Sequence, residues 1–255
     1  MLRCRLALAL AAALVPGAAA QVVNTEKLRL SDDVQGLHVD VSSAFAYATG
    51  NTDYLQLGLG GRTDYRRDRD AGFVTGSLAF SRADGRTFLN DAFAHARYNR
   101  AVAGPLTAEL FVQTQRSEAQ LLERRYLAGA GLRLDLVRAE AARLALGVTP
   151  MLEIERLDPV AEEPTAARGR LSSYLTARVA LGDLVTFSNT VYAQPAFSDV
   201  GDLRLFNETQ LDLGVSRYVA VRTRVNVRHD SDPPADLDPT DLSVTNGIAV
   251  TFPVD

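Results

Sequence analysis

Apolar and polar residues alternate along most of this chain, and this alternation limits the folds open to it. It is clearest in 55–59 (LQLGL), 219–228 (VAVRTRVNVR) and 242–252 (LSVTNGIAVTF). A period of two residues is typical of β-strands, because successive side chains point to opposite faces of a strand. The polar positions carry charges as well as Ser and Thr. A soluble sandwich would bury the apolar face, whereas a membrane barrel would turn it toward lipid and keep the polar face inside.

The N-terminus of the chain indicates export. Arg3 and Arg5 precede a short apolar run that ends at Ala20, a pattern typical of a secretory signal cleaved after Ala20. The run is too short to span a bilayer as a helix. Cys4, the single cysteine, would be removed with the signal, which excludes a disulfide framework and a thiol nucleophile in the mature protein. No later segment has the pattern of a membrane helix, so we expect either a soluble periplasmic protein or a barrel in the outer membrane.

Composition adds two constraints. The net charge of −4 argues against nucleic acid as a partner. Trp is absent, which counts against a membrane barrel, although the eight Tyr and ten Phe are enough for thinner interfacial girdles. We therefore expect three regions: a signal peptide at 1–20, a short periplasmic segment at 21–35 and a barrel at 36–255.

Strand-like runs follow one another at even spacing after the N-terminal segment. About twelve strands are expected. They lie at 37–48, 54–65, 72–82, 88–99, 105–117, 122–136, 141–156, 168–181, 184–197, 202–216, 218–229 and 240–252. Counted from the first strand, the even-numbered connections are mostly short, whereas the odd-numbered ones include the long stretches 156–169 and 230–239. This asymmetry and the even strand count predict an all-β fold, a transmembrane antiparallel up-and-down β-barrel of the outer membrane.

The parity of the apolar positions assigns the charged residues to the inner face of this barrel. The lumen-lining set is Arg62, Asp64, Asp91, Arg97, Glu109, Arg133, Asp135, Glu153, Arg170, Arg178, Glu208, Asp212, Arg222, Arg224 and Arg228. The same parity places Asp40, His95, Arg125, Glu155 and Arg204 inside. Charges of both signs that face one another in a narrow lumen have to pair. Two interpretations follow: an ion-pair network that plugs a structural barrel, or a narrow polar channel that the arginines of 218–229 bias toward anions.

One short motif suggests an enzyme. His229 and Ser231 share one face of a strand, the spacing that barrel phospholipases and lipid A deacylases use. Parity places both on the lipid-facing side near the extracellular rim, where an acyl chain would lie. A third group has to orient the imidazole, and Asn246 on the next strand is the best candidate by parity, although we expect it to lie too deep in the bilayer, several residues down the strand from the rim. The alternative is a strand that ends in a solvated loop, so we expect no enzyme activity and keep a lipid hydrolase as the rival hypothesis.

No metal site or cofactor is expected. His38 and His95 have no His or Cys partner at a ligand spacing. The acidic run from Asp230 to Asp241 lacks the spacing and the glycine of an EF-hand loop. We expect this run to be a solvated extracellular loop, able to bridge to lipopolysaccharide phosphates through divalent cations.

An ordered set of short motifs resembles a known family. The first hairpin reads FAYATGNTDYLQLGLG at 45–60, and RRYLAGAGLRLDL at 124–136, VYAQP at 191–195 and HDSDPP at 229–234 follow it. Their order and spacing are similar to those of the bacterial salt-induced outer membrane proteins, a domain family of unknown function, over residues 35–252. The resemblance implies an outer-membrane β-barrel of a Gram-negative bacterium and implies no enzyme activity.

The expected function is that of a non-enzymatic envelope component or a narrow polar channel. A soluble periplasmic β-barrel binding module is the second alternative. The expected partners are outer-membrane lipid, lipopolysaccharide and, during biogenesis, the barrel-assembly machinery. Nothing in the sequence indicates an oligomeric state.

Overall fold

The structure, a computed structural model, describes residues 24, 26, 35–50, 53–157, 165–182, 184–216, 219–234 and 237–250. These residues form twelve β-strands and a short 3-10 helix, η2 (Glu118–Gln120). The strands are β1 (Gly36–Ala48), β2 (Tyr54–Arg67), β3 (Asp70–Ala83), β4 (Arg86–Ala103), β5 (Leu106–Ser117), β6 (Leu122–Arg138), β7 (Ala142–Leu157), β8 (Ala166–Leu181), β9 (Val185–Pro195), β10 (Leu203–Gly214), β11 (Val219–Asp230) and β12 (Thr240–Val250). Each predicted strand range overlaps one of these strands. No helix in the described part of the chain is long and apolar enough to cross a membrane.

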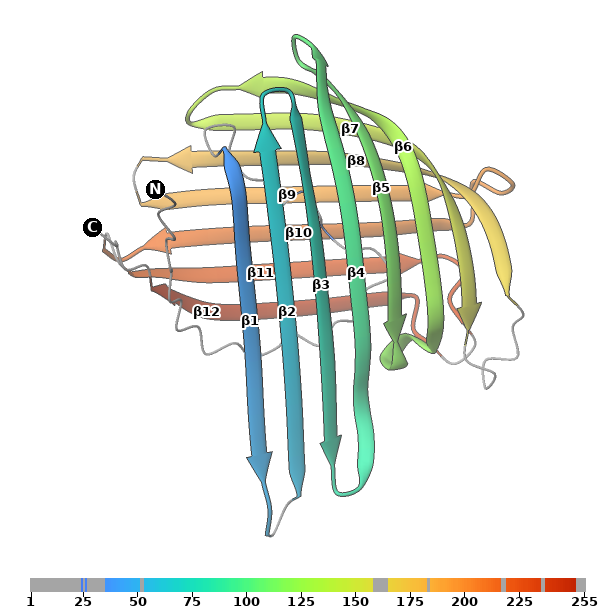
Figure 1. The fold of residues 1–255 in the computed structure, drawn as a ribbon. Coiled ribbons are helices and arrows are strands. Elements are labelled where there is room, and N and C mark those ends of the chain that lie inside the picture. The colour runs from blue at the N-terminus through green and yellow to red at the C-terminus, as the bar shows by residue number, and fades with distance from the viewer. Residues whose placement is uncertain are drawn as a thin grey trace.

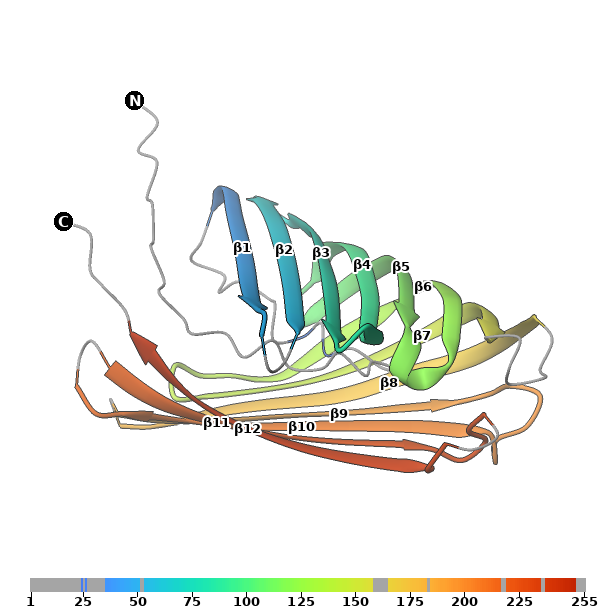
Figure 2. The same ribbon diagram turned by 90° about the horizontal axis from the view of Figure 1, so that it is seen from below.

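The strands follow one another around a single sheet in the order of the sequence. Each pairs with the next in antiparallel orientation, so the predicted all-β, up-and-down arrangement is confirmed. The sheet is strongly curved: β1–β5 lie across β8–β12, and β6 and β7 lie at the bend between the two layers (Figure 1, Figure 2). Among the described residues β1 and β12 are not paired with each other, so they form the two edges of the sheet.

The connections divide the molecule into two ends. Those after even-numbered strands, at 68–69, 104–105, 139–141, 182–184 and 215–218, define the short-turn end. Those after odd-numbered strands include the long ones, at 158–165, 196–202 and 231–239, and define the long-loop end. Asp84 and Gly85 close the tight β3–β4 hairpin with φ angles of 46° and 79°, because the twist of paired strands favours turn residues with positive φ.

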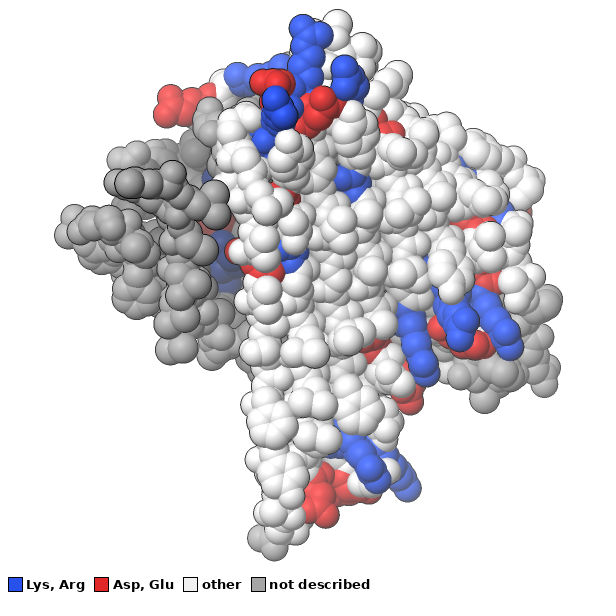
Figure 3. All heavy atoms as spheres, in the orientation of Figure 1, with Lys and Arg blue, Asp and Glu red and all other residues white. Residues whose placement is uncertain are grey.

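The alternation sorts the side chains between the two faces of the curved sheet. On β5, Glu109 and Gln113 are buried on the concave face, whereas Leu110 and Val112 are 53% and 54% exposed on the convex face. Over β1–β5 the convex surface is largely uncharged, and its Arg, Asp and Glu side chains gather toward the two ends of the strands (Figure 3). The polarity is therefore reversed relative to a soluble protein, which rarely exposes so continuous an apolar surface.

A glycine lets the interior pack closely where the sheet bends. Tyr174 of β8 lies over its register partner Gly147 of β7, where an added Cβ would come within 2.1 Å of the ring. Tyr174 in turn packs with Tyr192 and Phe206 into a buried aromatic cluster. Any side chain at Gly147 would therefore displace Tyr174 and disturb this cluster.

A charged interior as the candidate functional site

The residues that the alternation assigns to the lumen lie on the concave face of the sheet. The buried members are Asp64, Asp91, Arg97, Glu109, Glu153, Arg170 and Glu208. The half-buried members are Arg62, Arg133, Asp135, Asp212, Arg224 and Arg228. Arg178 and Arg222 are exposed, and they line a hollow at the short-turn end. Of the further residues with the same parity, His95, Arg125, Glu155 and Arg204 are buried and Asp40 is exposed.

Charged side chains from five strands and one connection meet at the long-loop end. The long-loop cluster consists of Arg125, Glu153, Glu155, Arg170, Asp202, Arg204 and Asp230. Strand register brings its members to one level, because Arg125 lies opposite Glu155 and Arg204 lies opposite Asp230. Asp202 and Asp230 are not among the predicted lumen residues, since they lie in or next to a connection, where the alternation ends.

Arg204 of β10 pairs with three carboxylates of the long-loop cluster. Its Nη1 donates to Glu153 Oε2 at 2.5 Å and its Nη2 to Glu155 Oε2 at 3.3 Å. Its Nε donates to Asp230 Oδ2 at 3.1 Å. The Arg204 side chain is only 3% exposed, so these carboxylates replace the water that its charge would otherwise require.

The other two arginines of the cluster are held in the same way. Arg170 donates to both oxygens of Asp202, at 2.8 and 2.9 Å, and to Glu153 Oε1 at 3.0 Å. Arg125 Nε donates to Glu155 Oε2 at 2.5 Å. Paired, hydrogen-bonded charges are the form in which ions are tolerated in a dry interior. The cluster thus links β6, β7, β8, β10 and β11 at the long-loop end.

A second set of ion pairs joins the N-terminal part of the chain to the interior. The carboxylate of Glu26 bridges two arginines: Oε1 accepts from Arg97 Nη1 of β4 and Oε2 accepts from Arg133 Nη1 of β6. The Glu26 side chain is 1% exposed. Nearby, Asn24 Nδ2 donates to Glu208 Oε1 of β10 at 2.9 Å. Sequence reasoning misses this arrangement, because the N-terminal segment has no alternation that would place it on either face.

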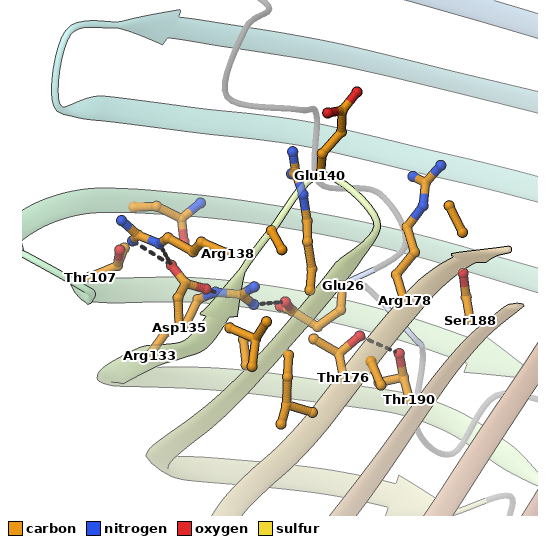
Figure 4. Close-up of a pocket in the computed structure, with 18 of the residues that line it drawn as sticks. Glu26, Thr107, Arg133, Asp135, Arg138, Glu140, Thr176, Arg178, Ser188 and Thr190 are labelled. Carbon is orange, nitrogen blue, oxygen red and sulfur yellow. Dashed lines mark hydrogen bonds and ion pairs between the residues drawn. The ribbon is translucent and has the colours of Figure 1, made fainter. Parts of the chain in front are cut away.

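Glu26 and Arg133 line a hollow of about 1100 Å³ at the short-turn end. A row of ion pairs runs along its wall from Arg138 through Asp135 and Arg133 to Glu26 (Figure 4). Asp135 accepts from Arg133 Nε at 2.8 Å and from Arg138 Nη2 at 2.5 Å. The hollow is therefore walled by charges of both signs, held in place by their neighbours.

The predicted bias toward anions rests on three arginines of β11, and all three contact β10. Arg222 Nε donates to Asp212 Oδ1 at 2.6 Å, and Arg224 Nη2 donates to a glutamine amide oxygen at 3.1 Å. Arg228 lies over the ring of Phe206, 5.3 Å from its centroid. Because Arg222 has a carboxylate partner, the positive potential along β11 is weaker than the sequence alone suggests.

Aromatic side chains on the concave face separate the charged groups. His95 is stacked between Phe73 and Phe111, with ring centroids 5.5 and 5.6 Å away, and its Nδ1 lies 3.0 Å from Gln113 Oε1. Arg62 lies over Phe73 at 4.1 Å. The charged residues alone do not reveal these rings. Phe111 has the parity of Glu109 on β5, which is the sequence signal that could have found it, and the register places Phe73 opposite Arg97 of β4.

The structure does not bring Asn246 to His229, in agreement with the expected depth of Asn246, so Asn246 is not the third member of a hydrolase set. His229 lies opposite Thr240 in the β11–β12 register, and its Nδ1 is 2.9 Å from Thr240 Oγ1. Asn246 lies opposite Thr223, whose hydroxyl donates to it at 2.7 Å. The distance along β12 from Thr240 to Asn246 is about 20 Å at the usual rise of a strand.

Ser231 instead ties two connections together. Its Oγ donates to the carbonyl of Gly201 at 2.6 Å and accepts from the backbone N–H of Leu203 at 2.7 Å. These bonds hold the hydroxyl against the β9–β10 connection. In the described part of the chain no three His, Cys, Asp or Glu side chains are grouped so that they could hold a metal ion.

Comparison with known proteins gives one family and several similar structures, among them a porin and a translocator domain. The model of the family described as "Protein of unknown function, DUF481" matches residues 41–252. The NanC porin is 10% identical with a TM-score of 0.49, over 85% of this chain and 99% of that chain. The translocator domain of the autotransporter NalP from Neisseria meningitidis is 11% identical with a TM-score of 0.40, over 88% of this chain and 91% of that chain. No curated protein matches the chain.

Proposed function

The chain belongs to the family described as Protein of unknown function, DUF481, and because that description assigns no activity, we propose a function from the geometry of the chain itself. The protein is a non-enzymatic β-barrel of the outer membrane with a narrow polar channel, closed at the long-loop end in this conformation. The observation that carries the proposal is the reversed polarity of the sheet, with an apolar convex face and a charged concave face. This arrangement is stable in a lipid bilayer, where the apolar face contacts the hydrocarbon chains.

Strand length and strand number support a membrane-spanning barrel. The shortest strands have 11 residues and the longest has 18, whereas about 9 to 11 residues cross the hydrocarbon core. An open sheet edge is not tolerated in lipid, because its N–H and C=O groups find no partner there. We therefore propose that β1 and β12 pair in the membrane, which an even number of antiparallel strands allows.

The distribution of charges supports a channel that is shut at one end. The hollow at the short-turn end, which we place on the periplasmic side, is wide enough for a small solute. The long-loop cluster lies at the other end, and its arginines are buried among carboxylates. Conduction through such a barrel requires this cluster to rearrange. A cluster that never rearranges would make the protein a plugged structural barrel.

Two measurements test the proposal. The protein should fractionate with the outer membrane and, when refolded in detergent, should migrate faster on a gel before boiling than after it. In planar bilayers, small anion-biased current steps should appear, and Ala at Arg222, Arg224 and Arg228 together should shift the selectivity toward cations. Ala at Arg156, whose side chain is exposed at the long-loop end, is the control and should leave selectivity unchanged. Silence from a correctly folded protein would refute the channel, and a soluble periplasmic protein would refute the barrel.

A further inference from the structure

The two arginines that hold Glu26 form a site that exists independently of it. We call Arg97 and Arg133 the arginine clamp. Arg133 Nε donates to Asp135 Oδ1 at 2.8 Å, and its guanidinium lies 6.0 Å from the centroid of the Tyr174 ring. Arg97 lies 5.8 Å from the centroid of the Phe111 ring. Side chains of the sheet therefore position both guanidiniums, while Glu26 comes from 71 residues before Arg97.

The contacts that Glu26 makes in the clamp are those of a carboxylate alone. Each carboxylate oxygen accepts from one guanidinium, so the two arginines bind the two oxygens separately. Both guanidiniums are largely withdrawn from water, with side chains 5% and 12% exposed. Buried arginines require an anionic partner, and the planar carboxylate suits them well. Any free carboxylate that reached the clamp would satisfy it equally.

One arginine of the clamp, Arg133, lines the hollow at the short-turn end. Glu26 lines the hollow as well, and the hollow's volume of about 1100 Å³ is slightly above the usual range for small-molecule sites. Seven arginines and six carboxylates line it in the described part of the chain, and Glu26 is one of these carboxylates. When Glu26 leaves the clamp, the remaining wall has an excess of positive charge, which favours an anion in its place.

We propose that the arginine clamp binds the carboxylate of small organic acids and that Glu26 is a tethered competitor for the same site. The inference depends on the proposed function in one respect only: the short-turn end faces the periplasm, so the acid reaches the clamp from that side. Because Glu26 belongs to the same chain as the clamp, it competes at an effective concentration on the order of millimolar. A free acid therefore displaces Glu26 only at comparable concentrations, and the wild-type protein binds it weakly.

Equilibrium dialysis of radiolabelled succinate against the refolded protein in detergent tests this directly. Glu26→Ala removes the competitor and should tighten succinate binding at least tenfold. Glu26→Gln preserves the shape of the side chain without its charge and should tighten binding in the same direction. Glu123→Ala is the matched control, because it breaks a glutamate–arginine pair of 2.7 Å (to Arg156) outside the hollow and should change nothing. Succinamide, which has no carboxylate, should bind to none of these proteins.

A second substitution decides whether the clamp is the site. Arg97→Met or Arg133→Met, introduced with Glu26→Ala, should abolish the gained binding, with folding checked by the gel-mobility shift on boiling. The proposal is overturned if neither Glu26 variant gains affinity, or if the gain persists without either arginine. Dialysis involves no membrane and no current, so a failure of the clamp proposal is distinguishable from a failure of the channel proposal. Absence of current in a planar bilayer would refute the channel and would leave the clamp proposal intact.

Discussion

Replacing Arg204 with Met tests whether the long-loop cluster is dry. The Arg204 side chain is 3% exposed and faces Glu153 at 2.5 Å, Asp230 at 3.1 Å and Glu155 at 3.3 Å. Its removal leaves these carboxylates buried without enough positive charge nearby to compensate their negative charge. Removing one partner of a buried ion pair typically costs about 3 to 5 kcal/mol, and we expect Arg204→Met to lower the free energy of unfolding by that amount.

Arg156→Met provides the matched control at the same end of the molecule. Arg156 pairs with Glu123 at 2.7 Å, but the two side chains are 58% and 28% exposed. Exposed ion pairs contribute about 0 to 1 kcal/mol, because water and salt screen them. Arg156→Met should therefore leave the free energy of unfolding almost unchanged.

Urea unfolding of the protein in lipid vesicles, followed by the gel-mobility shift, measures both variants. Arg204→Met should shift the urea midpoint strongly and Arg156→Met hardly at all. Adding Glu153→Gln to Arg204→Met should recover part of the loss, since it removes one of the uncompensated charges. Equal, small losses in the two single variants would refute the reasoning, because they would mean that water fills the long-loop end.

Three further predictions concern other parts of the molecule. Gly147→Ala should destabilise the protein by about 1 to 3 kcal/mol, because the new Cβ overlaps the Tyr174 ring; the cost should shrink in a Tyr174→Leu background, as measured by urea unfolding. Val112→Arg on the convex face should lower the free energy of unfolding by about 2 to 4 kcal/mol if residue 112 lies near the bilayer midplane. Val102→Arg, near the short-turn end, should lower it by about 0 to 1 kcal/mol. Equal losses of the two variants in vesicle unfolding would argue against a lipid-facing surface. Ser231→Ala should leave phospholipid and lipid A unhydrolysed, as in the wild type, because the hydroxyl is bound to backbone; wild-type turnover that this change abolishes would revive the hydrolase hypothesis.

The strands, their order and the face on which most charges of the strands lie are determined by the sequence alone. Alternation is a local property, since neighbouring residues of a strand point to opposite faces regardless of what the strand contacts. Turns are local as well: Asp84-Gly85 specifies a hairpin through the φ angles that these two residues tolerate. Local signals of this kind are sufficient for an antiparallel meander, in which each strand pairs with the next.

Only the tertiary structure decides which charges meet. The register of β11 with β12 places Thr240 beside His229 and moves Asn246 along the strand, and no local pattern states that register. Glu26 reaches Arg97 across 71 residues of sequence, because curvature of the sheet brings β4 and β6 around a common interior. Burial then requires an opposite charge for each arginine, and whichever carboxylate the fold brings within reach becomes its partner.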